Sequence, residues 1–361
     1  GPTGGSASDN GNNGNTQAGM VTAGEWNDLR NWDFWSELML HGEDQMKEPY
    51  ARYNEQWKFY TRHRVAVRIT DESGNSVVGA KVELLKDGQT EWTAVSNNAG
   101  ECSLWYGLYD NQQLREDSCY KLQVEGTETP FAIVSTDWTD SVVNWNNCVT
   151  TPVSKTGTDI AFIVDATGSM GDEIRFLKDD LEDIIQQINA KTNLRTAALF
   201  YRDEGDDYVT KHSDFNSDLS KTQAFIAKQK ADGGGDYPEA VHTALENGLQ
   251  ELNWNENARV KIAFMLLDAP AHEQTDVKKS LQQSIQQYAA HGIRLIPIAA
   301  SGADKSTEFM LRYFAIATDG TYVFLTNDSG IGGEHIQATV GEYEVEKLND
   351  LIVRIINEFT E

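Results

Sequence analysis

The sequence predicts a chain of more than one domain, in which an all-β sandwich precedes a doubly wound α/β domain. Between residues 63 and 150, short runs such as "RVAVRIT" and "YKLQVEG" alternate apolar and polar residues and are separated by turn segments such as "DESGNS". From residue 155 to 361, continuously apolar runs such as "IAFIVD" alternate with helical stretches, which is typical of strands covered by helices on both faces. A chain of 361 residues can hold two or three such domains.

Helical periodicity supports the α/β assignment. Apolar residues recur at spacings of three and four over residues 174–188, 241–252 and 345–359. The segment "DDYVTKHSDF" (206–215) follows the strand "TAALFYR" after too few residues for a crossover helix. We therefore expect it to turn back as an antiparallel edge strand of an otherwise parallel sheet.

The region before the sandwich divides into two parts. Residues 1–20 are rich in Gly, Ser and Asn and almost lack apolar groups, so they are expected to form a flexible tether. Residues 21–62 are rich in tryptophan, including Trp26, Trp35 and Trp57. This aromatic segment could be a sugar-binding platform, but its loose spacing favours an amphipathic, partly helical segment packed on a neighbouring domain.

The charge balance excludes several classes of partner. The chain has 56 acidic and 30 basic residues and a formal net charge of −26. Such a charge repels nucleic-acid phosphates and anionic membrane surfaces and favours cations or a basic partner. No apolar run approaches the roughly 18 residues that a membrane-spanning helix requires.

All three cysteines lie in or beside the sandwich, at positions 102, 119 and 148. This clustering indicates an exported β-sandwich with one disulfide, for which Cys119 with Cys148 is our preferred pair and Cys102 the remaining thiol. Three reduced thiols are the alternative. A zinc site is disfavoured because the chain has no CxxC pair with a histidine at ligand spacing.

The sandwich sequence resembles a known family. "VAVRITDESGNSVVGAKVELL" followed by "TAVSNNAGECSLW" is similar to carboxypeptidase regulatory-like, transthyretin-like domains. In that family a pair such as Gly79-Ala80 opens the second strand, and a glycine such as Gly100 precedes the next one. The resemblance implies a spacer or docking module rather than a catalyst.

Oxygen-bearing side chains gather where strands of the α/β domain end. Asp165, Thr167 and Ser169 follow the first strand in "DATGS", Asp236 lies in the glycine loop "DGGGDYPE", and Asp268 ends the strand "VKIAFMLLD". Ligands of such sheets bind where strand carboxyl ends meet helix starts. Carboxylates and hydroxyls without His or Cys suit Mg²⁺ best, with Ca²⁺ or Mn²⁺ as alternatives. Asp165 alone could be a helix cap, but a cap does not explain three loops.

These residues resemble the metal-ion-dependent adhesion site of von Willebrand factor A-type domains, over residues 157 to about 327. The resemblance implies that Asp165, Thr167 and Ser169 form the DxSxS-type element and that Asp268 is the later aspartate. It also implies a protein ligand at the metal-bearing face. Asp236 stands in the loop where the family has a threonine, and this third carboxylate is expected to strengthen metal binding and to weaken capture of an acidic partner.

Catalysis is disfavoured. "TGSMG" nearly matches the G-x-S-x-G nucleophile elbow, with Ser169 as nucleophile and His272 as base. However, Thr167 stands at the position of the first glycine, and the elbow would fall on the first strand of the domain. The acidic run from Asp203 to Asp207 is interpreted as a solvated turn.

The functional expectation is an exported, surface-tethered binding or adhesion protein that is not an enzyme. The alternatives are a structural cell-envelope component whose metal stabilises the fold and, less favoured, a serine hydrolase. The tether resembles the spacer of bacterial surface lipoproteins, which implies a lipid anchor upstream of Gly1 and an extracytoplasmic location at the cell surface or outer membrane, or secretion. The sequence leaves the partner and the oligomeric state open.

Overall fold

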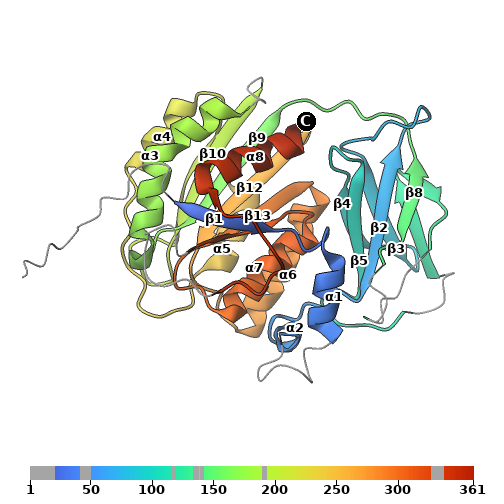
Figure 1. Ribbon diagram of the computed structural model, residues 1–361, viewed down its shortest axis with the longest axis horizontal. Helices are drawn as coiled ribbons and strands as arrows, with labels where there is room; N and C mark the ends of the chain where they lie inside the picture. The colour runs from blue at the N-terminus through green and yellow to red at the C-terminus, as the bar shows by residue number, and fades with distance from the viewer. Residues whose placement is uncertain are drawn as a thin grey trace, which may run out of the picture.

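A computed structural model of the chain describes residues 21–40, 50–114, 119–132, 138, 142–188, 193–326 and 337–361. The tether predicted over residues 1–20 lies outside the described residues. The model confirms the predicted fold class, because a central sheet flanked by helices is joined to a separate pair of β-sheets (Figure 1). No helix among the described residues is long and apolar enough to cross a membrane.

The central sheet has eight strands in the order β11-β10-β9-β12-β13-β14-β1-β15. Their bounds are β1 Thr22–Trp26, β9 Thr158–Asp165, β10 Leu194–Tyr201, β11 Thr210–Asn216, β12 Val260–Leu267, β13 Ile293–Ala299, β14 Tyr322–Leu325 and β15 Glu346–Lys347. Every residue of β9, β12 and β13 is buried, which explains their continuously apolar sequences. Strand β11 pairs antiparallel with β10 at the sheet edge, as predicted.

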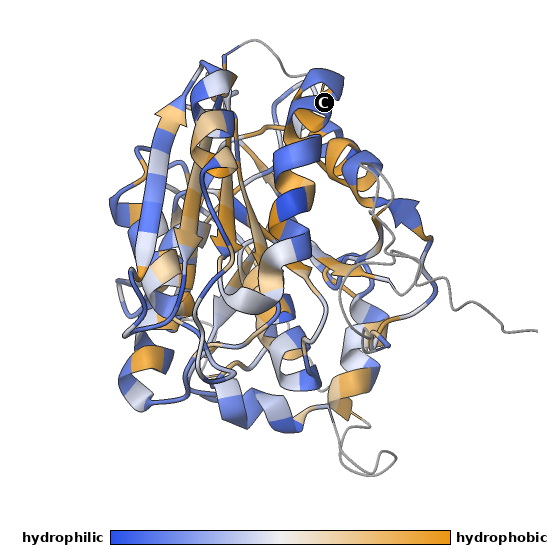
Figure 2. Cartoon of the chain, turned by 90° about the vertical axis from the view of Figure 1, so that its left-hand side faces the viewer, coloured by the Kyte–Doolittle hydropathy of each residue, from blue (hydrophilic) through white to orange (hydrophobic). Residues whose placement is uncertain are grey.

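Helices cover both faces of this sheet. On one face lie α3 (Gly171–Gln187), α4 (Leu219–Ala227) and α8 (Leu348–Thr360), and on the other lie α5 (Val241–Gln250), α6 (Thr275–Ala290) and α7 (Lys305–Ala317). Figure 2 shows the hydrophobic strands in the centre and the hydrophilic outward faces of the helices. The sheet therefore has two separate apolar cores, one on each side.

The aromatic segment is part of the α/β domain. Strand β1 inserts antiparallel between β14 and β15, which the sequence did not predict. A side chain at Gly24 would meet the rings of Tyr343 and Phe324 at 2.6 and 2.7 Å, so only glycine fits here. The α/β domain assigned to residues 155–361 is thus completed by a strand from the start of the chain.

Helices α1 (Trp32–Leu40) and α2 (Arg52–Trp57) then pack on α7. The ring of Trp35 stacks on that of Phe309 at 5.7 Å, and the ring of Phe59 stacks on that of Tyr313 at 4.3 Å. Trp35 and Phe59 are fully buried. These contacts favour the packing interpretation of the aromatic segment over a sugar platform, since a platform needs exposed ring faces.

A buried ionic network fixes the same segment to α7. The Arg312 guanidinium donates two hydrogen bonds to the Asp28 carboxylate, at 2.9 and 2.7 Å, and Glu308 lies 3.6 Å from Arg312. Arg312 and Asp28 are almost completely buried. The Tyr50 hydroxyl donates to Glu308 at 3.0 Å, so the network joins four side chains from three segments.

The sandwich consists of a three-stranded sheet, β5-β2-β8, and a four-stranded sheet, β4-β3-β6-β7. Their bounds are β2 His63–Thr70, β3 Lys81–Lys86, β4 Gln89–Val95, β5 Glu101–Tyr106, β6 Tyr120–Val124, β7 Thr127–Thr129 and β8 Trp145–Val149. Gly100 has a φ of +74°, and a side chain there would meet the Ile69 carbonyl oxygen at 2.3 Å. The sandwich is confirmed, and its likeness to the carboxypeptidase regulatory-like family stays a prediction.

The predicted disulfide is wrong. All three cysteines are free, with Cys102 and Cys148 buried and Cys119 partly buried. Cys148 lies in β8 of the three-stranded sheet, whereas Cys119 directly precedes β6 of the other sheet. Clustering in the sequence therefore did not indicate pairing in space, and the alternative of three reduced thiols is the observed one.

The buried His63 should make the stability of the sandwich sensitive to acid. Its side chain is buried, and burial followed by the charge of Arg62 lowers its pKa from 6.5 to about 4. Because the folded pKa lies below the unfolded one, the contribution of the neutral ring is complete above pH 6.5 and is lost as the pH falls towards 4. In wild type, the free energy of unfolding measured with urea should fall over this pH range. We expect this fall to be smaller in His63→Phe. Replacing the exposed His291 by phenylalanine should leave the pH dependence of the free energy of unfolding as in wild type. The same pH dependence in both variants would contradict the prediction.

Candidate metal centre

Three loops from the carboxyl ends of the central strands line one pocket of about 640 Å³. Thr167 and Ser169 come from the loop after β9, Asp236 from the glycine loop before α5, and Asp268 from the end of β12. The structure thus gathers at one edge of the sheet the groups that the sequence singled out, because the parallel register of β9 and β12 brings their ends together.

Asp165 is fully buried and is hydrogen-bonded to Thr167, which lines this pocket. Its Oδ1 accepts hydrogen bonds from the Thr167 backbone N–H at 2.9 Å and from the Thr167 hydroxyl at 2.6 Å. Its Oδ2 has no hydrogen-bond partner in the described part of the chain. Burial, followed by the charge of Asp268, raises the Asp165 pKa well above its usual value. The local geometry therefore disfavours the negative charge unless a cation balances it.

The remaining predicted ligands differ in exposure. Asp268 is 6% exposed and Thr167 is 2% exposed, whereas Ser169 and Asp236 are exposed. Ser169 lies in the short 3₁₀ turn at Gly168–Met170, directly before α3. The site therefore combines buried carboxylates with an exposed hydroxyl and an exposed carboxylate at its rim. It is open to solvent on one side.

Sequence reasoning missed two buried carboxylates beside the site. Glu239 is 4% exposed and its Oε2 has no hydrogen-bond partner among the described residues. Burial, followed by the charges of Asp165, Asp203 and Asp268, raises its pKa to about 9. Glu173 is 3% exposed, accepts a hydrogen bond from the Ser301 hydroxyl at 3.1 Å, and has a pKa raised by burial to about 7. In the sequence, each is an acidic residue near a helix start, which is a common position for exposed acids.

The acidic run after β10 is not only a solvated turn. Asp203 is 6% exposed and lies 2.7 Å from Nε2 of His272. Asp206 accepts the Gly234 backbone N–H at 3.2 Å, and a side chain at Gly233 would meet the Asp206 carboxylate at 2.7 Å. Asp206 therefore fixes the glycine loop that carries Asp236. His272 is therefore oriented by Asp203, and no hydrogen bond joins it to Ser169 in the described structure.

The donor atoms fit a hard divalent cation. They are carboxylate and hydroxyl oxygens, and three buried carboxylate oxygens, on Asp165, Glu173 and Glu239, lack hydrogen-bond partners within the described structure. No group of three or more His, Cys, Asp or Glu among the described residues is arranged to hold a metal ion. A metal here would thus take hydroxyl and water oxygens besides carboxylates, as Mg²⁺ does. Direct ligation by Asp236 stays a prediction.

Replacing Asp236 by threonine tests its role. We expect Asp236→Thr to weaken Mg²⁺ binding by less than a change at buried Asp165, since an exposed carboxylate acts mainly through its charge. The metal-free form should gain stability because one of several neighbouring negative charges is lost. Melting curves with and without Mg²⁺ measure both effects. An unchanged metal-induced shift would place Asp236 outside the site.

Comparisons with known proteins agree with this geometry. The model of the von Willebrand factor A domain family matches residues 159–326. An ariadne-like RING finger protein, R811, of Acanthamoeba polyphaga mimivirus is 34% identical over 128 residues, which are 35% of this chain. The match spans only 12% of the length of that relative.

Solved structures are similar at low identity. Proximal thread matrix protein 1 from the mussel byssus, with a zinc-occupied MIDAS motif, is 18% identical with a TM-score of 0.41, and the match covers 57% of this chain and 46% of that one. The pilus adhesin SpaC from Lactobacillus rhamnosus GG, in an open conformation, is 11% identical with a TM-score of 0.39, covering 56% of this chain and 29% of the other.

The family match and the observed sheet coincide from β9 to β14, and the match includes the loops that form the pocket. Residues 159–326, slightly less than half of the chain, are therefore similar to the von Willebrand factor A domain family.

Proposed function

We propose that this von Willebrand factor A-like domain binds a divalent metal, Mg²⁺ in the first place, and through it a protein partner. Asp165, Thr167, Ser169 and Asp268 would hold the ion. The observation that carries this proposal is the buried Oδ2 of Asp165, which has no partner in the described structure. The other carboxylate oxygen of Asp165 is bound by Thr167, which lines a pocket together with Ser169, Asp236 and Asp268. Bound metal would supply a positive charge with an open coordination position towards solvent.

The rim of the pocket offers a contact for a partner. Tyr237 is 42% exposed, and its hydroxyl is held by the carbonyls of Asp268 and Gly302 at 3.3 and 3.0 Å. Its hydroxyl also accepts the Asp304 backbone N–H at 3.0 Å. A rigidly held, exposed aromatic ring beside a metal is suited to be an anchor in a protein interface.

Calorimetric titration of the full chain with Mg²⁺, after chelation and dialysis, tests metal binding. We expect saturable binding that is lost in Asp165→Asn and kept in Asp179→Asn, an exposed carboxylate on α3. Absence of binding for Mg²⁺, Mn²⁺ and Ca²⁺ alike would overturn the proposal.

The role of the metal is tested separately. A pull-down from envelope or host-matrix extract, with and without chelator, is compared with melting temperatures under the same conditions. Loss of capture in chelator supports adhesion through the metal, and the melting temperature is then expected to fall as well, because bound metal stabilises the folded state by mass action. A chelator-induced drop in melting temperature without any loss of capture supports the alternative, in which the metal stabilises a structural cell-envelope component.

We further propose that the protein acts outside the cytoplasm, at the cell surface or after secretion, and that it is not an enzyme. The Gly/Ser/Asn-rich composition of residues 1–20 supports the first point. The second is supported by His272, whose ring contacts Asp203 and makes no hydrogen bond to Ser169 among the described residues. The free cysteines remove the disulfide as an argument for export. Cell fractionation tests the location, and labelling of Ser169 by a fluorophosphonate probe would contradict the absence of hydrolase activity.

A further inference from the structure

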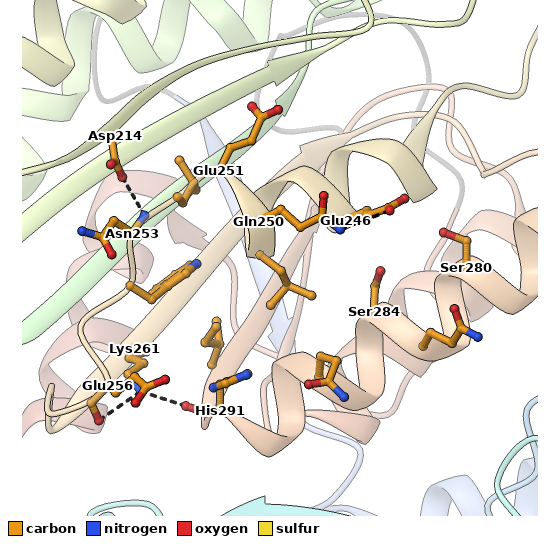
Figure 3. A pocket seen from close by; sticks show the side chains of 16 residues that line it. Asp214, Glu246, Gln250, Glu251, Asn253, Glu256, Lys261, Ser280, Ser284 and His291 are labelled. Carbon is orange, nitrogen blue, oxygen red and sulfur yellow. Dashed lines mark hydrogen bonds between the residues drawn. The ribbon is translucent and has the colours of Figure 1, made fainter.

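A groove of about 720 Å³ is lined by residues of α5 and α6 (Figure 3). It lies at the end of the sheet opposite to the candidate metal centre. It is reached from the amino ends of β12 and β13, where Lys261 and Ile293 contribute to its wall. The metal centre instead lies at the carboxyl ends of the strands. The groove is therefore separate from the site described above, and its volume is in the range of small-molecule sites.

The packing of the two helices creates this groove. A side chain at Gly248 of α5 would meet the Tyr288 hydroxyl of α6 at 2.3 Å, so the helices approach closely at this point. That hydroxyl donates to the Leu245 carbonyl at 2.7 Å. Past this contact the chain leaves α5 and folds back, held by a hydrogen bond of 2.9 Å from Trp254 Nε1 to the Gly248 carbonyl. The groove is thus walled by fixed elements.

The groove is strongly acidic. Its lining includes the four carboxylates of Asp214, Glu246, Glu251 and Glu256, against a single lysine. None of the four is in an ion pair with a lysine or arginine in the described part of the chain; Glu251 lies 2.9 Å from Nδ1 of His212. The buried Lys261 ammonium donates to two backbone carbonyls, at 3.0 and 3.4 Å. The lining therefore keeps an excess of negative charge.

A second observation also points to a ligand. Ser284 of α6 is 6% exposed, and its hydroxyl has no hydrogen-bond partner among the described residues. Figure 3 shows this hydroxyl directed into the groove, across from Glu246. The Ser284 hydroxyl lines the groove and makes no hydrogen bond there to a described residue, so it can accept one from an incoming donor.

Apolar side chains complete the lining, from Leu249, Leu252 and Ile293. The groove thus combines negative charge, a hydroxyl acceptor and a hydrocarbon surface. A long cationic side chain has the complementary make-up, because its methylene stem packs on apolar groups while its charged head reaches polar ones.

We propose that this groove binds an aliphatic cation, an ammonium or guanidinium group on a methylene stem, supplied either by a free polyamine or by a lysine or arginine of a peptide. Glu246 and its neighbouring carboxylates balance the charge, and Ser284 accepts a hydrogen bond. The net charge of −26 attracts such a ligand at long range.

Calorimetric titration of the full chain with spermidine and, separately, with a blocked lysine-containing tripeptide tests the proposal. Mg²⁺ is kept saturating, so that the cation does not compete for the metal centre. Glu246→Gln is expected to raise the dissociation constant roughly tenfold, as for the loss of one charge-assisted contact. Ser284→Ala should also raise it. The tighter of the two probes identifies the source of the cation.

Glu182→Gln is the matched control. Glu182 and Glu246 are both exposed helical glutamates, and each accepts a hydrogen bond from the glutamine four residues later, at 3.2 and 3.3 Å. Glu182 lies on α3, away from the groove, so its replacement should leave binding unchanged. Failure of both probes to bind wild type at low ionic strength, or equal weakening in Glu182→Gln and Glu246→Gln, would overturn the proposal.

Discussion

Replacing Arg312 by alanine is expected to lower the free energy of unfolding by about 3–5 kcal/mol, the cost of leaving one member of a buried ion pair without its partner. Arg312 is fully buried and its guanidinium binds both carboxylate oxygens of Asp28. Its loss would leave Asp28 as an uncompensated buried acid in the contact that holds the aromatic segment on α7, whereas Glu308 keeps its ion pair with Lys305 at 3.5 Å. Urea unfolding of the full chain measures the change.

Arg354 provides the control. It makes ion pairs with Glu25, Glu346 and Glu358, but its side chain is 36% exposed. Solvent partly screens these pairs, so Arg354→Ala should cost less than Arg312→Ala. If Arg312→Ala does not fold, the double variant Asp28→Asn with Arg312→Met, which removes both charges, should recover soluble protein. Equal losses for Arg312→Ala and Arg354→Ala would contradict the prediction.

Replacing Asp165 by asparagine is expected to abolish the stabilisation by Mg²⁺, which by mass action amounts to about 2.7 kcal/mol at a hundredfold excess over the dissociation constant. Asparagine keeps the side-chain shape and can still accept the two hydrogen bonds from Thr167. It removes the charge that the ion would balance. The metal-free variant should therefore be at least as stable as metal-free wild type, because the repulsion from Asp268 is lost.

Melting curves of wild type and Asp165→Asn, each with and without Mg²⁺, measure both effects. Asp179→Asn, an exposed change on α3, should keep the full metal-induced shift. A shift that survives in Asp165→Asn would remove Asp165 from the site and with it the basis of the proposed function.

Local patterns in the sequence were enough to predict the two kinds of domain. Each signal depends on residues that are close together in the chain. The signals are the continuous apolar runs of β9 and β12, the helical spacing of α3 and the short link before β11. The strand-end positions of Asp165 and Asp268 follow from the same patterns, because the carboxyl ends of parallel strands share one edge.

Other features depend on contacts between distant residues, and only the tertiary structure decided them. Strand β1 has five residues, "TAGEW", with no marked alternation, and it pairs with β14 near the other end of the chain. Asp28 meets Arg312 from 284 positions away. Neither partner carries a local signal of the pairing, since exposed and buried ion pairs use the same residue types.

The candidate site also has some features that follow from the sequence and others that only the tertiary structure decided. The sequence by itself determined which strand ends carry oxygen-bearing side chains, because periodicity places strand ends along the chain. Only the tertiary structure decided that Glu239 and Glu173 are buried beside Asp165 and that Asp236 is exposed. It also decided that Cys119 and Cys148 belong to different sheets. The physical reason is that burial and charge coupling are set by neighbours in space, which the order of residues along the chain does not specify.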